Sequence, residues 1–172
     1  MNNPFTLFDL PVDYQIDETL LKSRYLQLQK QLHPDNFAQS SSQEQRLAIQ
    51  KSAQVNDAWQ QLTDPVLRAE CIIALNAGDS LIASETNHDL EFLMQQMQWR
   101  EELADIEEKQ DLDLLDALTK QVNGVKQDVL TGLVSSLDEK NWTQAKQQTD
   151  RLRFIQKLFV EIERVDDKLS DF

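Results

Sequence analysis

The chain has 172 residues, enough for one domain of ordinary size or two small ones. Residues 1–76 hold 6 Lys and Arg against 9 Asp and Glu, whereas residues 77–172 hold 11 against 21, which indicates two modules and argues against a nucleic-acid partner. The single cysteine, Cys71, excludes an internal disulfide or a cysteine-bound metal, and the lack of an apolar leader or membrane-length segment predicts a cytoplasmic protein without membrane contact.

The first half of the chain shows a succession of helical patterns. Few glycines and prolines and many good helix formers predict an all-α fold. Pro4 to Phe8 can form one helical turn, and Asp17 suits the N-cap of a helix over about residues 18–32. The apolar stripe expected on this helix is Leu21, Tyr25, Leu28 and Leu32, with Lys22, Leu26, Lys30 and His33 on the opposite side.

The pattern then passes through a polar segment, residues 36–42, which reads as a loop ending in a serine N-cap. A second long helix is expected over about residues 42–62, and Asp64-Pro65 opens a short third one that ends near residues 76–79. The second helix offers these residues for packing: Leu47, Ala48, Val55, Ala58, Trp59 and Leu62.

The first long helix ends at His33-Pro34-Asp35. Proline cannot continue a helix and moves the preceding residue out of the α region, so His33 should leave the helix end and Asp35 should lie in the loop. On its own this tripeptide is also compatible with a simple proline stop followed by an aspartate cap.

The surrounding sequence resembles the J domain, the module of DnaJ-type co-chaperones, over residues 4–75. Three segments carry the resemblance in the same order: PFTLFDLP, LLKSRYLQLQKQLHPDNF and VNDAWQQLTDPVLRAE. The resemblance implies that His33, Pro34 and Asp35 trigger ATP hydrolysis by a DnaK-like chaperone. It also implies that Lys22, Arg24 and Lys30 steer binding. Asn36 stands where many family members have a basic residue.

Three further helices are expected after residue 85, over about 86–108, 111–138 and 141–169. We therefore predict a J domain over 1–76, a linker over 77–85 and an antiparallel three-helix bundle over 86–172. The expected bundle seams are Leu115, Leu118, Val122, Val125, Val129 and Leu133 on the middle helix and Leu152, Ile155, Phe159, Ile162 and Leu169 on the last.

The first helix of this bundle has two apolar faces. One face carries Phe92, Trp99, Leu103 and Ile106, and nearly opposite lie Leu90, Leu93, Met94 and Met97. Because a three-helix bundle buries one face, the second is surplus. Two interpretations stay open: the second face packs against the first module, or it is an exposed patch that binds another protein.

The acidic helical extension, with LMQQMQWREELADIE and LRFIQKLFVEIERVDDKLSDF, resembles the HscB family of iron–sulfur co-chaperones. The bacterial form also lacks a cysteine-rich zinc segment, as this sequence does. The resemblance implies a partner chaperone of the HscA type and a scaffold protein of the IscU type. It places scaffold binding on Leu93, Met94, Met97, Glu101, Asp105 and Phe154. Gln98 replaces the usual acid, and Asp105 is the shorter acid.

Other functions find less support in the sequence. A J protein that activates a general DnaK-type chaperone for other clients is the alternative, and the acidic bundle in place of zinc and Gly/Phe segments counts against it. A di-metal carboxylate enzyme would need Glu-x-x-His pairs, and none is present. Without a Gly-rich phosphate loop, the chain is not expected to be an enzyme or to hold a cofactor.

Overall fold

The computed structural model describes residues 3–84 and 89–171, and the chain divides into two compact units, Met1–Ile72 and Ile73–Phe172. No strand occurs within those described ranges, so the predicted all-α fold is confirmed. None of the helices in the same ranges is long and apolar enough to cross a membrane. The elements up to residue 83 are α1 (Pro4–Leu7), α2 (Glu18–Gln31), η1 (Pro34–Phe37), α3 (Ser42–Thr63), α4 (Pro65–Ala77) and α5 (Asp79–Ala83).

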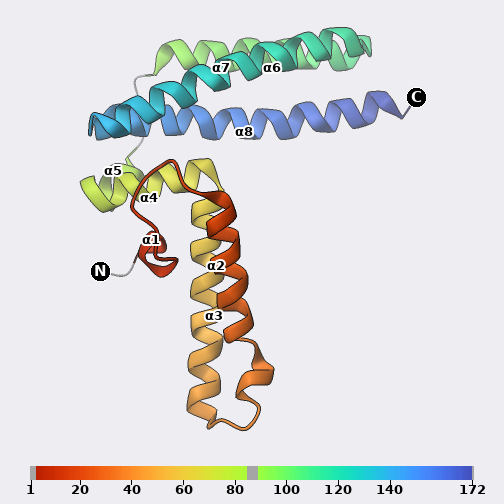
Figure 1. The fold of residues 1–172 in the computed structure, drawn as a ribbon. Helices are drawn as coiled ribbons and strands as arrows, with labels where there is room; N and C mark the ends of the chain where they lie inside the picture. The colour runs from red at the N-terminus through yellow and green to blue at the C-terminus, as the bar shows by residue number, and fades with distance from the viewer. Residues whose placement is uncertain (1–2, 85–88, 172) are drawn as a thin grey trace. The chain divides into compact units, whose positions relative to one another are not determined.

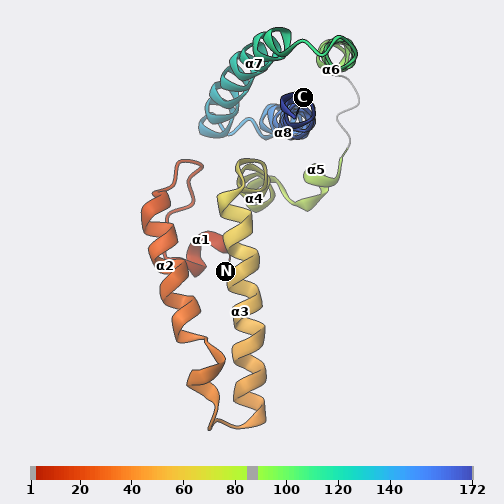
Figure 2. The ribbon, with the colours of Figure 1, turned by 90° about the vertical axis from the view of Figure 1, so that its right-hand side faces the viewer.

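The N-terminal unit is built on the antiparallel hairpin of α2 and α3, which lie side by side in Figure 1 and Figure 2. The expected caps are present: the Asp17 carboxylate accepts a hydrogen bond from the Leu20 amide, and the Ser41 hydroxyl accepts one from the Glu44 amide. The one-turn helix α1 packs on α3; its residue Phe5 and its C-cap residue Phe8 are both fully buried. This four-residue helix and its C-cap thus supply two of the largest buried side chains of this unit.

Two expectations for the hairpin were wrong in detail. Leu47 was expected to pack, but it is 56% exposed. Successive residues of a helix are rotated by about 100° about its axis. Because Ala48 points into the core, Leu47 points away from it. The segment expected as a loop from residue 36 begins inside a 3-10 turn, η1, because Pro34 at its first position has φ already set for a helical turn.

The C-terminal unit contains α6 (Leu90–Lys109), α7 (Leu112–Asp138) and α8 (Trp142–Ser170). Short connections over residues 110–111 and 139–141 require antiparallel neighbours, and Figure 2 shows the three helices grouped together. The expected seams of α7 and α8 are buried, except that Val125 and Phe159 are half-buried. The expected start of α6 at residues 86–88 lies outside the described residues, and α5 lies within the segment expected as a linker.

The contrast between two leucines on α3 gives a test of this packing. Replacing Leu62, which is fully buried, by alanine should lower the free energy of unfolding by about 2–5 kcal/mol through the cavity it leaves. Leu47→Ala, the matched control on the same helix, should change it by less than about 0.5 kcal/mol. Urea denaturation followed by circular dichroism measures both. Equal losses would contradict the burial assigned to α3.

Candidate functional site

The His-Pro-Asp loop, residues 33–37, joins α2 to α3. The His33 ring caps η1, because its Nδ1 accepts a hydrogen bond from the Asp35 backbone amide at 3.2 Å. The same nitrogen lies 3.6 Å from the Asp35 carboxylate, which is 92% exposed. Because Nδ1 accepts this hydrogen bond, a neutral His33 ring carries its proton on Nε2. The exposure of the Asp35 carboxylate leaves it accessible to a partner.

The exposed loop is anchored to both helices that it joins. The Asn36 side-chain amide donates to the carbonyl oxygens of Lys30 at 2.7 Å and Gln31 at 3.3 Å. From α3, the Gln45 side-chain amide donates to the Phe37 carbonyl at 2.9 Å. These contacts hold the loop backbone in place while leaving the side chains of His33 and Asp35 in solvent.

Aromatic and polar contacts hold the arms of the hairpin together. The rings of Tyr25 and Trp59 stack with centroids 4.3 Å apart. Next to them, the Asn56 side-chain oxygen accepts hydrogen bonds from the Tyr25 hydroxyl at 2.8 Å and from the Gln29 amide at 2.6 Å. The position of the loop therefore depends on specific contacts as well as on the apolar stripe, of which only Leu21 is fully buried on α2.

The three cations that the resemblance assigned to chaperone binding differ in their surroundings. Lys22 and Lys30 are exposed on α2. Arg24 is half-buried, and its guanidinium donates to the carbonyl oxygens of Phe8 and Asp9. Asp9 has a left-handed backbone with φ 52°, so Arg24 fixes a strained turn after α1 as well as carrying charge.

The second candidate site is the exposed face of α6, formed by Leu90, Leu93, Met94 and Met97. These side chains are 67%, 49%, 71% and 62% exposed, respectively. The opposite face of the same helix is buried through Phe92, Trp99, Leu103 and Ile106, as the sequence pattern predicts. Glu101 and Asp105 continue the exposed side, and the Asp105 carboxylate pairs with Lys109 at 2.9 Å. This is an apolar patch with an acidic margin.

At its N-terminal end, α6 is fastened to α8 by a bidentate ion pair. The Arg151 guanidinium donates twice to the Asp89 carboxylate, each time at 2.7 Å, and lies 5.1 Å from the centre of the Phe92 ring. Asp89 also caps α6 through the Phe92 amide. The hydrogen bond from Arg151 lowers the pKa of Asp89 below its ordinary value of 3.8.

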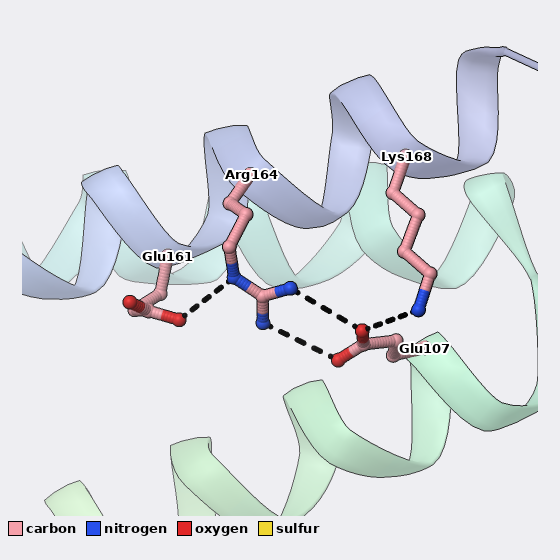
Figure 3. Close-up of polar contacts among 4 residues, drawn as sticks. All are labelled: Glu107, Glu161, Arg164 and Lys168. Atoms are coloured by element: carbon pink, nitrogen blue, oxygen red, sulfur yellow. Dashed lines mark hydrogen bonds and ion pairs between the residues drawn. The ribbon is translucent and has the colours of Figure 1, made fainter.

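At the other end of α6, Glu107 forms ion pairs with two basic residues of α8, as Figure 3 shows. Its carboxylate lies 3.3 Å from Arg164 and 3.1 Å from Lys168, and Arg164 also pairs with Glu161 at 3.2 Å. The hydrogen bonds from Arg164 and then Lys168 lower the pKa of Glu107. Both ends of α6 are thus tied to the same neighbouring helix.

Phe154 lies on α8 between Arg151 and Arg164 in sequence, and its ring belongs to an aromatic cluster with Phe92 and Trp99. Its ring meets Phe92 edge-on with centroids 5.8 Å apart and stacks on Trp99 at 6.5 Å, and the Arg100 guanidinium lies 5.4 Å from its centre. Phe154 is half-buried, so it belongs to the packing of α6 on α8 as well as to the predicted surface. Sequence periodicity gives no signal for the pairing of residues 89 and 151.

In the parts of the chain that the structure describes, no group of three His, Cys, Asp or Glu residues is placed to hold a metal ion. Cys71 is half-buried, and burial raises the pKa of its thiol. A half-buried thiol of this kind packs in part as a small apolar group.

Comparisons with known proteins agree with these features. Residues 88–163 match the family described as HSCB C-terminal oligomerisation domain. The co-chaperone protein HscB homologs of Mannheimia succiniciproducens and Haemophilus influenzae are 57% and 52% identical, over 100% and 99% of both chains. The structure of chaperone HscB from Vibrio cholerae is 40% identical, with a TM-score of 0.85 over 98% of this chain and 99% of that one. Human co-chaperone HscB, 24% identical, shares the fold with a TM-score of 0.84 over 95% of this chain and 81% of that one.

The Asp89–Arg151 pair gives a pH-dependent prediction. Asp89→Asn keeps a good N-cap residue but removes the carboxylate, so the free energy of unfolding at pH 7 should fall by about 1.5–3 kcal/mol. Because the folded pKa of Asp89 is depressed, this contribution is present above pH 3.8 and is lost as the pH falls through the folded pKa. The difference between variant and wild type should therefore shrink below pH 3.8.

Urea denaturation at pH 7 and at a pH below 3.8 measures this difference in the free energy of unfolding. Asp116→Asn, which removes the acid of an exposed pair with Lys120, is the control and should cost less than about 0.5 kcal/mol. If Asp89→Asn lowers the free energy of unfolding as little as the control does, the Asp89–Arg151 ion pair does not stabilise the C-terminal unit.

Proposed function

The chain belongs to the HscB family of co-chaperones, and we propose that it delivers an iron–sulfur scaffold protein of the IscU type to a dedicated DnaK-like chaperone of the HscA type. In this proposal it stimulates the ATPase of that chaperone and is not itself an enzyme. The observation that carries the proposal is that the two units each present a different exposed site. One is an anchored loop with an open carboxylate, Asp35, and the other is the exposed apolar face of α6.

The chaperone-binding role rests on the chemistry of the loop. An exposed carboxylate on an anchored backbone can form a short, directional ion pair with an arginine of the chaperone. Lys22 and Lys30 supply exposed positive charge on the helix leading into the loop, which raises the rate of encounter more than the affinity. Arg24 joins them in the proposed surface, although its guanidinium also holds the turn after α1.

The scaffold-binding role rests on the exposed face of α6. Leucine and methionine side chains that stay in solvent in the free protein gain burial when a partner covers them, and methionine adapts its shape to that partner. Glu101 and Asp105 at the margin favour a partner surface with positive charge. Phe154 supplies an aromatic side chain from α8, which its contacts with Phe92 and Trp99 hold in one orientation.

The proposed division of labour follows the chain. Residues 1–76 act as the J domain that contacts the chaperone, residues 77–85 connect the parts, and residues 86–172 hold the scaffold protein. We place this activity in the cytoplasm, where a chaperone with ATP and a scaffold protein would both be accessible.

The trigger is tested by Asp35→Asn. The variant keeps the shape of the side chain but loses a charge-assisted bond, so stimulation of the chaperone ATPase should fall roughly ten- to a hundredfold. His33→Gln should act in the same direction, because it changes the hydrogen bond that caps η1. Steady-state ATP hydrolysis by the purified HscA-type chaperone is the measurement.

Scaffold affinity and circular dichroism of these variants serve as controls and should match the wild type. Full stimulation by Asp35→Asn would remove the proposed role of the loop. Equal stimulation of a general DnaK-type chaperone by the wild type would instead favour the alternative of a general co-chaperone.

The patch is tested by alanine substitutions at Leu93 and Met97. Each should weaken scaffold binding by about 1–4 kcal/mol, because buried anchors at interfaces carry much of the affinity. Neither should change the melting temperature much, since both side chains are exposed in the free protein. Phe154→Ala should lower both affinity and stability, because its ring also packs on Phe92 and Trp99.

Isothermal titration calorimetry with the purified scaffold protein and thermal melts separate these effects. Leu114→Ala on α7, where the side chain is 43% exposed, is the matched control and should leave both quantities unchanged. A large fall in melting temperature with unchanged affinity for Leu93→Ala and Met97→Ala would mean that the face is an internal packing surface.

A further inference from the structure

At the C-terminal end of α2, a side chain from the following loop donates hydrogen bonds to backbone carbonyl groups of the helix. The last carbonyl groups of a helix have no partner within the helix, and the following residues often supply backbone amides to them. Here Pro34 has no backbone N–H and forces His33 out of the helical conformation. The Asn36 side-chain amide takes over this role, donating to the carbonyl oxygens of Lys30 at 2.7 Å and Gln31 at 3.3 Å.

The same residue is fixed through its backbone. The Asn36 backbone amide donates to the His33 carbonyl at 3.0 Å. One residue earlier, the Asp35 backbone amide donates to the His33 ring at 3.2 Å. Asp35 therefore lies between the capping residue His33 and the anchored Asn36, while its side chain stays 92% exposed.

We propose that Asn36 is a positioning residue for the trigger, which ties the His-Pro-Asp loop to α2 so that the Asp35 carboxylate is presented in one place to the chaperone. This inference rests on the proposed function. An exposed loop without this anchor would have to be ordered when the active complex forms, and that ordering would oppose activation. The short asparagine side chain supplies the anchor with few rotamers to fix.

The anchor from α3 provides a comparison within the same loop. The Gln45 side-chain amide donates to the carbonyl oxygens of Phe37 at 2.9 Å and Ser40 at 3.5 Å, on the side of the loop away from the His-Pro-Asp tripeptide in sequence. If position in the chain matters, removing the Asn36 amide should affect the trigger more than removing the Gln45 amide.

The test compares Asn36→Ala, Asn36→Gln and Gln45→Ala in the full chain, titrated against the purified HscA-type chaperone. For Asn36→Ala we expect the maximal stimulated ATPase rate to fall roughly two- to tenfold, because a hydrogen bond that orders the loop is lost. The co-chaperone concentration for half-maximal stimulation should stay the same, because Lys22 and Lys30 remain in place. Asn36→Gln retains the amide and should recover part of the rate.

The plateau of the titration separates positioning from a merely structural role. A partly unfolded variant would need a higher concentration but would reach the wild-type plateau, and its melting temperature would fall. A wild-type plateau for Asn36→Ala, or an equal loss for Gln45→Ala, would overturn the role of Asn36 if Asp35→Asn still lowers stimulation as expected. Full stimulation by Asp35→Asn would overturn the proposed trigger itself, and the role of Asn36 with it.

Discussion

The attachment of α6 to α8 is the interaction on which the exposed face of the C-terminal unit depends. α6 buries only four large apolar side chains, whereas α7 and α8 share a continuous apolar seam. The bidentate pair of Asp89 with Arg151 and the paired cations on Glu107 fix both ends of α6. Together with the buried face of the helix, these contacts fix the rotation of α6 about its axis, so that Leu93 and Met97 face solvent.

The N-terminal unit follows a related logic with different chemistry. α2 has one fully buried side chain, Leu21, so burial alone gives it a weak hold on α3. The stack of Tyr25 on Trp59 and the hydrogen bonds to Asn56 attach α2 to α3, and the contacts of Arg24 attach α2 to the turn after α1. These contacts leave the other side of α2, with its lysines, in solvent. In both units, directional contacts take over part of the work of an apolar core, and exposed side chains stay available to a partner.

Sequence periodicity predicted the long helices and both faces of α6, because burial repeats with the helical period. It failed at Leu47, which has the right residue type but a rotation about 100° away from its buried neighbour Ala48. It could not find the pairing of Asp89 with Arg151, since a contact between residues 62 positions apart leaves no local pattern. It could not show that Phe154 is half-buried, because a stripe shows which side chains are apolar and not how deeply the edge of the stripe is covered. The resemblance alone assigned Phe154 to the predicted scaffold-binding site.

The two proposed sites carry charge of opposite sign, and this has a consequence for partner choice. The loop is preceded by the exposed cations Lys22 and Lys30, whereas the apolar face of α6 is bordered by Glu101 and Asp105. Like charges brought together at an interface cost several kcal/mol of binding free energy. A chaperone surface that is acidic around an arginine fits the loop and is repelled by the margin of α6, and a basic scaffold surface behaves in the opposite way. Under the proposed function, the charges at each site therefore favour its own partner, even though the chain as a whole carries a net charge of −13.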